Sequence, residues 1–132
     1  DLPPGTGDEP LTIAQLIPKA DGVVIVTTPQ DIALTSVRRS IRFAGLVKLR
    51  VLGLVDNMNG FVCPHCGQEA EGLGGSLAFQ AAMEYGVPYL GKVPLDPRVA
   101  TSADNGRPFV LDGEPKAFDP ILDEILERVE GA

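Results

Sequence analysis

The fold is decided by residues 23–57, which read VVIVTTPQDIALTSVRRSIRFAGLVKLRVLGLVDN. The apolar runs at residues 23–27 and 51–55 are short, rich in β-branched side chains and apolar on both faces, as buried parallel strands are. Between them, apolar residues recur at three- and four-residue spacing over residues 31–44, which predicts an amphipathic helix that Gly45 ends. This stretch therefore predicts a strand, a helix and a second strand in succession.

The flanking sequence continues this alternation in both directions. The pattern predicts a short helix around residues 11–17, a helix over 76–85, a third strand over 87–93 and a closing helix over 120–129. Asp8 and Pro10 suit the N-cap and first turn of the helix around residues 11–17. Gly86 ends the helix over 76–85, and Pro88 weakens the strand over 87–93. Strands that alternate with helices predict an α/β fold, with a parallel sheet flanked by helices on both faces.

Composition excludes several classes of protein. The 132 residues carry 11 Lys plus Arg against 18 Asp plus Glu, a formal net charge of −7, and the basic residues form no cluster. This balance argues against a nucleic-acid partner and against a polybasic membrane surface. No apolar run approaches the roughly 20 residues that span a bilayer, and no signal peptide is recognisable at the start. We expect a soluble, cytoplasmic protein of one domain or less, and the start at Asp1 rather than Met predicts a piece of a longer protein.

Ligands of a parallel sheet bind at the carboxyl ends of its strands, which here are residues 28–31, 56–60 and 94–96. Asn57 follows the second strand, and its amide could donate to and accept from the edge of a purine, or it could merely cap a turn. The opening string DLPPGTGD, residues 1–8, suits a turn that carries a carboxylate toward Mg²⁺ and a backbone N–H toward a γ-phosphate. A Pro-Gly turn with an incidental Asp is the alternative.

The two cysteines of the chain lie two residues apart in Cys63-Pro64-His65-Cys66. Two thiolates at this spacing can hold one side of a metal, but a zinc or iron–sulfur site needs about four ligands, so one chain offers half a site. Three interpretations remain open: a cluster shared by two chains, a zinc site shared by two chains, and a thioredoxin-like redox pair. The redox pair is disfavoured because no long helix is predicted after the first cysteine, and His65 is expected to be exposed.

Four segments together resemble the carboxyl-terminal half of the Mrp/ApbC-type ATPases, which are iron–sulfur cluster carriers related to MinD and the nitrogenase iron protein. They are DLPPGTGD, VVIVTTPQDIALTSVRRSI, VLGLVDNMNGFVCPHCG and YGVPYLGKVPLDPRVATSADNGRPF. The resemblance covers nearly the whole chain in the order of the family. It implies a partial P-loop NTPase domain of the MinD type whose ligands are ATP, Mg²⁺ and a [4Fe–4S] cluster.

The resemblance also assigns roles to individual residues. It implies that Cys63 and Cys66 bridge the cluster across a homodimer and that apo iron–sulfur proteins receive it. Asp1 would hold Mg²⁺ through water and Gly5 would sense the γ-phosphate. Asn57 would contact adenine, and the same base would be bordered by two further residues, Pro94 and Asp96.

One departure from the family bears on activity. The family carries a Gly-rich phosphate-binding loop with a Lys, and no G-x-x-x-x-G-K-[ST] occurs in these 132 residues. We therefore expect residues 1–132 to be the carboxyl-terminal portion of a single P-loop ATPase domain, without that loop and inactive alone. Two alternative functions are a MinD-like switch ATPase and a non-enzymatic dimeric zinc-binding module. The acidic polar face of the closing helix disfavours a membrane-binding switch.

Overall fold

The computed structural model describes residues 2, 7–17, 19–63, 65–70, 77–111 and 118–131. Its sheet has a parallel part and a short antiparallel addition, formed by β1 (Val23–Thr27), β2 (Val51–Val62), β3 (Glu69–Ala70) and β4 (Tyr89–Leu95). The helices are α1 (Asp8–Leu16), α2 (Asp31–Leu46), α3 (Leu77–Tyr85), α4 (Pro97–Asp104) and α5 (Asp119–Glu130), with a 3₁₀ turn, η1, at Phe109–Leu111. β2 pairs in parallel with β1 and with β4, and its far end pairs antiparallel with β3.

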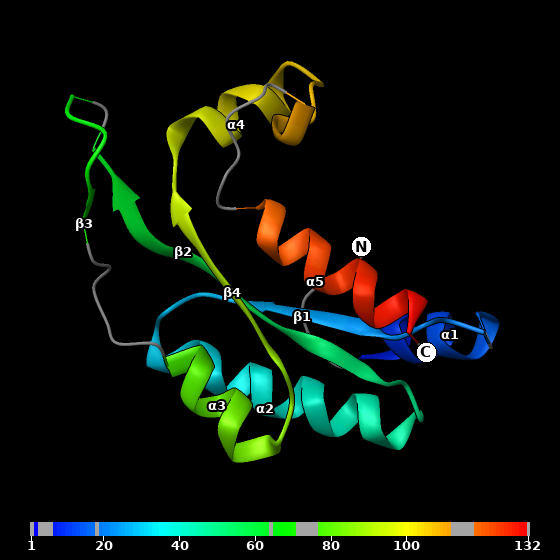
Figure 1. The fold of residues 1–132 in the computed structure, drawn as a ribbon. Coiled ribbons are helices and arrows are strands. Elements are labelled where there is room, and N and C mark those ends of the chain that lie inside the picture. Colours follow the sequence, from blue (N-terminus) through cyan, green and yellow to red (C-terminus); the bar gives the residue numbers. More distant parts are fainter. Residues whose placement is uncertain are drawn as a thin grey trace.

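Helices cover both faces of the parallel strands (Figure 1). α2 and α3 pack on one face, while α5 packs on the other against β4 and β2. The prediction of a parallel sheet flanked by helices is therefore confirmed. None of the described helices is long and apolar enough to cross a membrane.

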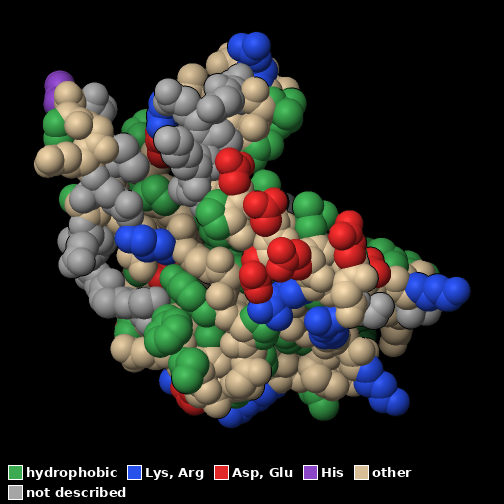
Figure 2. All heavy atoms as spheres, in the orientation of Figure 1, with side chains coloured by type: hydrophobic (Ala, Val, Ile, Leu, Met, Phe, Trp, Pro, Cys, Tyr) green, Lys and Arg blue, Asp and Glu red, His purple; other side chains and the backbone are tan. Residues whose placement is uncertain are grey.

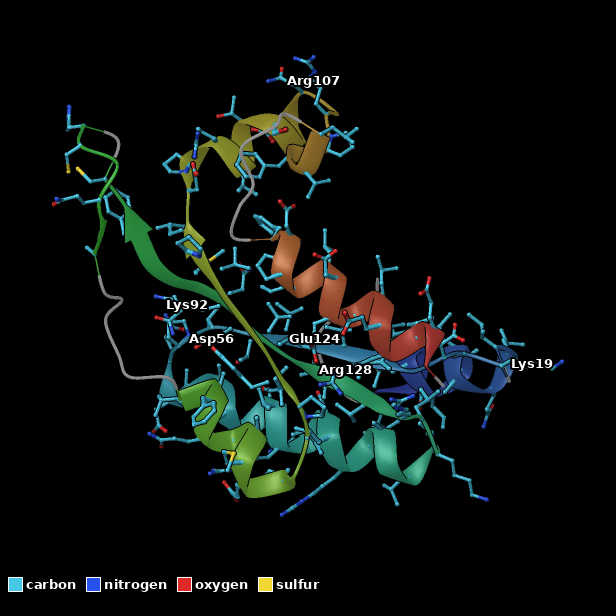
Figure 3. The ribbon with its side chains drawn as sticks, viewed as in Figure 1. Lys19, Asp56, Lys92, Arg107, Glu124 and Arg128 are labelled. Atoms are coloured by element: carbon cyan, nitrogen blue, oxygen red, sulfur yellow. The ribbon has the colours of Figure 1, made fainter. Side chains whose placement is uncertain are left out.

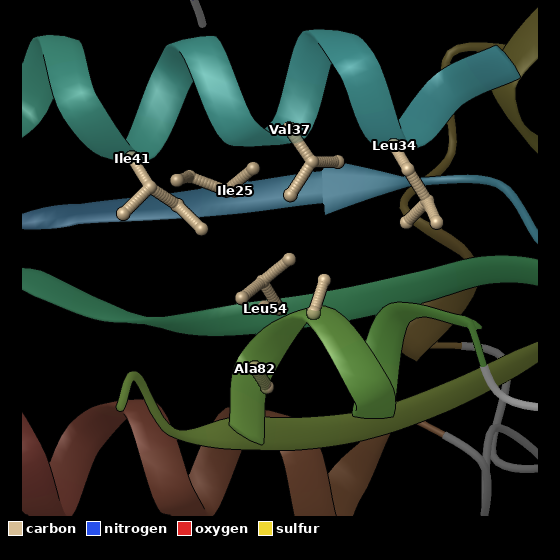
Figure 4. Close-up of a cluster of buried hydrophobic side chains, with 7 residues drawn as sticks. Ile25, Leu34, Val37, Ile41, Leu54 and Ala82 are labelled. Carbon is tan, nitrogen blue, oxygen red and sulfur yellow. The ribbon is translucent and has the colours of Figure 1, made fainter. Parts of the chain in front are cut away.

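The larger core lies between the sheet and the helices α2 and α3 (Figure 4). Its buried members are Ile25, Leu34, Val37, Ile41, Leu54, Ala81 and Ala82. Leu54 of β2 is fully buried, and burying such a side chain stabilises the fold by about 1.5–3 kcal/mol. On the opposite face, a Cβ at Gly53 would lie 2.5 Å from the Leu90 side chain, so glycine is what lets Leu90 pack against β2.

Two predicted helix ends differ from the structure. Gly45 does not end α2, which continues to Leu46. After the helix, the N–H of Lys48 donates to Gly45 O, and the N–H of Leu49 donates to Ala44 O. Lys48 takes the left-handed conformation, φ 59°, that the sequence analysis expected glycine to supply. The N-cap of α1 is Gly7 rather than Asp8, which lies in the first turn. Gly86, in contrast, takes φ 62° directly after α3, as expected.

The strands also differ from the prediction in extent. The strand predicted over residues 51–55 runs on to Val62 and forms a hairpin with β3, in a region where no regular structure was expected. The third strand begins after Pro88 and reaches Leu95, which removes the conflict with that proline. Val26 of β1 is 61% exposed, so this strand is not buried on both faces along its whole length.

Candidate functional site

The pairing of β2 with β4 brings two of the predicted base-binding residues together. Asn57 of β2 is the Cα partner of Val93 of β4, and Pro94 is the next residue along β4. Asn57 is half-buried, and its Oδ1 accepts the N–H of Met58 at 3.1 Å. This bond leaves the Nδ2 donor of Asn57 without a partner among the described residues. Asp1 and Gly5, the predicted Mg²⁺ and γ-phosphate residues, lie outside the described part of the chain.

Asp96 follows β4 and caps α4. Its Oδ1 accepts the backbone N–H of Arg98 at 2.8 Å, and its Oδ2 lies 2.7 Å from the guanidinium Nη2 of the same residue. The hydrogen bond from the Arg98 side chain holds the pKa of Asp96 below its ordinary value. Both carboxylate oxygens therefore have a structural partner, and contact with a base stays a prediction.

A hollow of about 430 Å³, which was not predicted from the sequence, lies beside α4. Its lining is polar and cationic with one aromatic ring, and it comprises Pro97, Arg98, Thr101, Ser102, Asn105, Arg107 and Phe109. The Arg98 guanidinium lies 5.8 Å from the centre of the Phe109 ring, a cation–π distance. The Asp96-Pro97 pair, an N-cap followed by proline at the first helical position, is the sequence signal that could have revealed α4.

The two cysteines lie at the tip of the β2–β3 hairpin, which projects from the body of the sheet (Figure 1). The N–H of Cys63 donates to Gln68 O at 2.9 Å, and the N–H of Gly67 donates to Cys63 O at 2.8 Å. Gly67 has φ 68°, a conformation that glycine adopts without steric cost. The turn thus holds Cys63 directly at the end of a strand, rather than at the start of a helix as in thioredoxin-like redox pairs.

The chemistry of the turn favours a thiolate at Cys63. Backbone hydrogen bonds from Cys66 and His65 lower the pKa of the Cys63 thiol, because they stabilise the charged form. Cys63 is half-buried, whereas Cys66 and His65 are exposed, and neither cysteine forms a disulfide. The expectation that His65 is exposed is confirmed.

No group of three or more His, Cys, Asp or Glu side chains in the described part of the chain could hold a metal ion. A tetrahedral zinc or an iron–sulfur cluster takes about four ligands, so the Cys63–Cys66 turn has the donors for one half of such a site. That each chain supplies half of a shared metal shell stays a prediction.

A buried polar pair that the sequence analysis missed lies between the two sites. Asn59 Nδ2 donates to Asp56 Oδ2 at 2.6 Å, and the two residues are 6% and 0% exposed. Burial raises the pKa of Asp56, while the bond from Asn59 and the charge of Lys92 act in the opposite direction. Lys92 is the Cα partner of Asp56 on β4, and Figure 3 shows the two near one another. The sequence signal for this pair was Asp56 itself, a carboxylate directly after the apolar run LGLV of a buried strand.

Charged side chains of α5 and α2 lie on different helices of the described part of the chain. Acidic side chains gather over α5 in Figure 2, in agreement with the acidic polar face predicted for the closing helix. Two arginines of α2 contact α3: Arg38 pairs with Glu84 at 3.0 Å, and Arg42 donates to the Tyr85 hydroxyl at 3.5 Å.

Comparison with known proteins places this geometry in a family. The chain is 43% identical to an iron–sulfur cluster carrier protein of Methanocaldococcus jannaschii, over 99% of this chain and 46% of that protein. It is 40% identical to the cytosolic Fe-S cluster assembly factor NUBP2 of Bos taurus, over 98% of this chain and 48% of the relative. The chain thus spans a little under half the length of these curated relatives.

Solved structures agree with the sequence comparison. A nucleotide-binding protein from Archaeoglobus fulgidus, solved in complex with ADP and with cobalt found in it, matches with a TM-score of 0.73 and 40% identity, over 89% of this chain and 47% of that one. The MinD cell division protein of Aquifex aeolicus matches with a TM-score of 0.61 at 20% identity, over 88% of this chain and 46% of that one, which shows a shared fold. The model of one family, ParA, described as NUBPL iron-transfer P-loop NTPase, matches residues 1–130, and the chain belongs to that family.

Proposed function

We propose that this chain is the part of an ATP-dependent iron–sulfur cluster carrier that binds the cluster and the nucleotide base. Two chains would hold one [4Fe–4S] cluster between them and pass it to apo iron–sulfur proteins. The observation that carries this proposal is the projecting β2–β3 hairpin, whose turn holds Cys63 and Cys66. Family membership, with relatives named as cluster carriers and assembly factors, supports the same function.

The donor set of the hairpin favours a shared cluster. Each chain has two cysteines, and a [4Fe–4S] cluster takes about four thiolates, so two hairpins related by a two-fold axis would complete the shell. The hydrogen bonds that lower the pKa of Cys63 favour the thiolate, which is the form that binds iron. The cluster is the cargo in this proposal, and dimer assembly is the step that creates its site.

The nucleotide site would lie at the carboxyl edge of the sheet. Asn57 and Pro94 lie on adjacent strands, and the Nδ2 group of Asn57 could donate to a ring nitrogen of adenine. The family resemblance supplies the remaining roles, Mg²⁺ binding for Asp1, γ-phosphate sensing for Gly5 and base contact for Asp96. ATP turnover by the whole protein would couple to cluster transfer, in the cytoplasm as the named function of the bovine relative suggests.

Anaerobic reconstitution tests the proposal directly. The chain is incubated with ferrous iron, sulfide and a reductant, and bound iron, acid-labile sulfide and zinc are then measured. The loaded protein is mixed with the apo form of an enzyme that needs a [4Fe–4S] cluster, and recovery of enzyme activity is followed. We expect half a cluster per chain and transfer to the enzyme.

Two results would reject the carrier function. Zinc as the sole metal retained by a dimer would favour the zinc-binding module. A cluster that forms but never reaches the apo enzyme would favour a resident cluster with another purpose.

A further inference from the structure

One strand passes through both proposed sites. β2 runs from Val51 to Val62, carries Asn57 near its middle, and is followed immediately by Cys63. Only five residues separate the predicted base contact from the first cysteine. Any change in the path of β2 over these residues therefore changes how the hairpin is directed relative to the nucleotide edge.

The path of β2 is irregular at this point. Asn57 pairs with Val93 and Phe61 pairs with Leu95, so four steps along β2 match two steps along β4. The extra residues form a bulge in which Met58 has φ 61° and Gly60 has φ 103°. A left-handed conformation costs a residue with a side chain roughly 1–2 kcal/mol, so the surrounding structure must hold Met58 in place.

The buried Asp56–Asn59 pair spans this bulge. Its 2.6 Å hydrogen bond joins the residue before Asn57 to the second residue after it, and neither side chain is more than 6% exposed. The other oxygen of Asp56, Oδ1, is buried without a hydrogen-bond donor in the described part of the chain. An apolar side chain would fill this position on β2 at lower cost, because a buried carboxylate loses its hydration.

We propose that Asp56 is a positioning residue whose bond to Asn59 fixes the bulge and so directs the cysteine hairpin. This inference rests on the proposed function, because it assigns Asp56 to the presentation of Cys63 and Cys66. The carboxylate does not touch the cluster. It acts through Asn59 and the backbone of residues 57–62, which lead directly to the first cysteine.

Two substitutions at one position separate positioning from simple stabilisation. Asp56→Asn keeps an oxygen that can accept from Asn59, whereas Asp56→Val removes the acceptor, favours a strand and removes the buried charge. We expect Asp56→Val to unfold in urea at about the same concentration as the unsubstituted chain, because removing the buried charge offsets the loss of the acceptor for Asn59 Nδ2. Asp56→Asn serves as the conservative variant that restores positioning.

Amide hydrogen exchange of the metal-free chain is the first measurement. In Asp56→Val, the amides of residues 59–63 should exchange faster, while the N–H of Leu54, bonded to Pro88 O in the core, should keep its protection. In Asp56→Asn, the amides of residues 59–63 and the N–H of Leu54 should all keep their protection. Unchanged exchange over 59–63 in Asp56→Val would overturn the inference, as would a uniform loss of protection that includes Leu54.

Cobalt(II) affinity, read from thiolate-to-cobalt absorbance, is the second measurement. Asp56→Val should weaken binding by about 10- to 100-fold, the loss typical when groups that support metal ligands are removed, with little change in Asp56→Asn. Equal affinity in all three proteins would overturn the role in presenting the cysteines.

Failure of the proposed function can be told apart from failure of this inference. If the unsubstituted chain binds neither cobalt nor a cluster, the proposed function fails, and amide hydrogen exchange still decides whether Asp56 fixes the bulge. If Asp56→Val does not fold, the double variant Asp56→Asn/Asn59→Ala, which removes the buried charge together with the hydrogen bond, takes its place in both measurements.

Discussion

The backbone N–H of Cys63 donates a 2.9 Å hydrogen bond to the carbonyl oxygen of Gln68, which closes the turn at the tip of the hairpin. The bond joins the end of β2 to the residue before β3 and keeps the two cysteines on one short turn. Hydrogen bonding from the backbone of Cys66 and His65 lowers the pKa of the Cys63 thiol. The hairpin thus holds the two cysteines close together on one turn and lowers the pKa of Cys63.

Loss of either cysteine should abolish cluster binding. Cys63→Ala or Cys66→Ala leaves each chain with a single thiolate, so a dimer has about half of the ligands that a [4Fe–4S] cluster takes. Iron and sulfide counted after anaerobic reconstitution should fall to background in both variants. His65→Ala is the matched control, because this exposed residue lies in the same turn and should leave the cluster content unchanged. A full cluster in either cysteine variant would refute the shared site.

Periodicity was sufficient to predict the central fold. The helix α2 and the strands around it follow from the spacing of Leu34, Val37 and Ile41 and from the two apolar runs, since these patterns reflect burial on one face or on both. The end of α2 was not predictable in this way. Lys48 takes a left-handed conformation at modest cost, although a glycine is available three residues earlier.

The site was predictable only in part. Cys63 and Cys66 stand out because two thiolates at this spacing have few other uses in a chain without further cysteines. The Asp56–Asn59 bond could not be anticipated, because it exists only where β2 bulges, and in a regular strand residues three apart point to opposite faces. The bulge in turn depends on pairing with β4, which is distant in sequence.

Asp96 should contribute to stability as a helix cap. Asp96→Ala removes the acceptor for the N–H of Arg98 and should lower the free energy of unfolding by about 1 kcal/mol, as is typical for N-cap loss. Asp96→Asn should retain most of that stability, because Asn is also a good N-cap. Urea denaturation at neutral pH measures both variants, and an Ala variant as stable as the unsubstituted chain would contradict the capping role.

The pair of Asp96 with Arg98 also predicts a pH dependence. The folded-state pKa of Asp96 is below its unfolded value, which is about 3.9. The ion pair therefore stabilises the fold fully at pH values above the unfolded pKa, and this stabilisation is lost as the pH falls through the folded-state pKa. The stability difference between the unsubstituted chain and Asp96→Asn should therefore shrink as pH falls below 4. A difference that grows with acidity would show that another group sets it.

The 132-residue chain should hydrolyse ATP at the background rate. Catalysis of phosphoryl transfer depends mainly on positioning and charge around the β- and γ-phosphates, and the chain has no G-x-x-x-x-G-K-[ST] sequence to supply them. Phosphate release in the presence of Mg²⁺ and ATP is the measurement. Turnover that Asp1→Ala abolishes would show that the residues present suffice for catalysis, and that the phosphate-binding lysine is not required.

Cluster binding should drive dimerisation. Each hairpin holds half of the ligands, so the free energy of metal binding becomes available only when two chains meet about a two-fold axis. Exposed apolar side chains lie at the base of the hairpin and would be covered in such a dimer: Met58 is 54% exposed, Phe61 38% and Leu95 46%, and Phe61 is the Cα partner of Leu95. We expect a monomer without metal and a dimer with the cluster.

Light scattering of the metal-free and the reconstituted protein decides this. The double variant Cys63→Ala/Cys66→Ala controls for association through the apolar surface alone, and it should remain monomeric under reconstitution conditions. A monomer that carries a full cluster would defeat the prediction, because one chain would then supply every ligand. A dimer of equal stability in the double variant would show that contacts other than the cluster join the chains, and that the cluster enters an interface already formed.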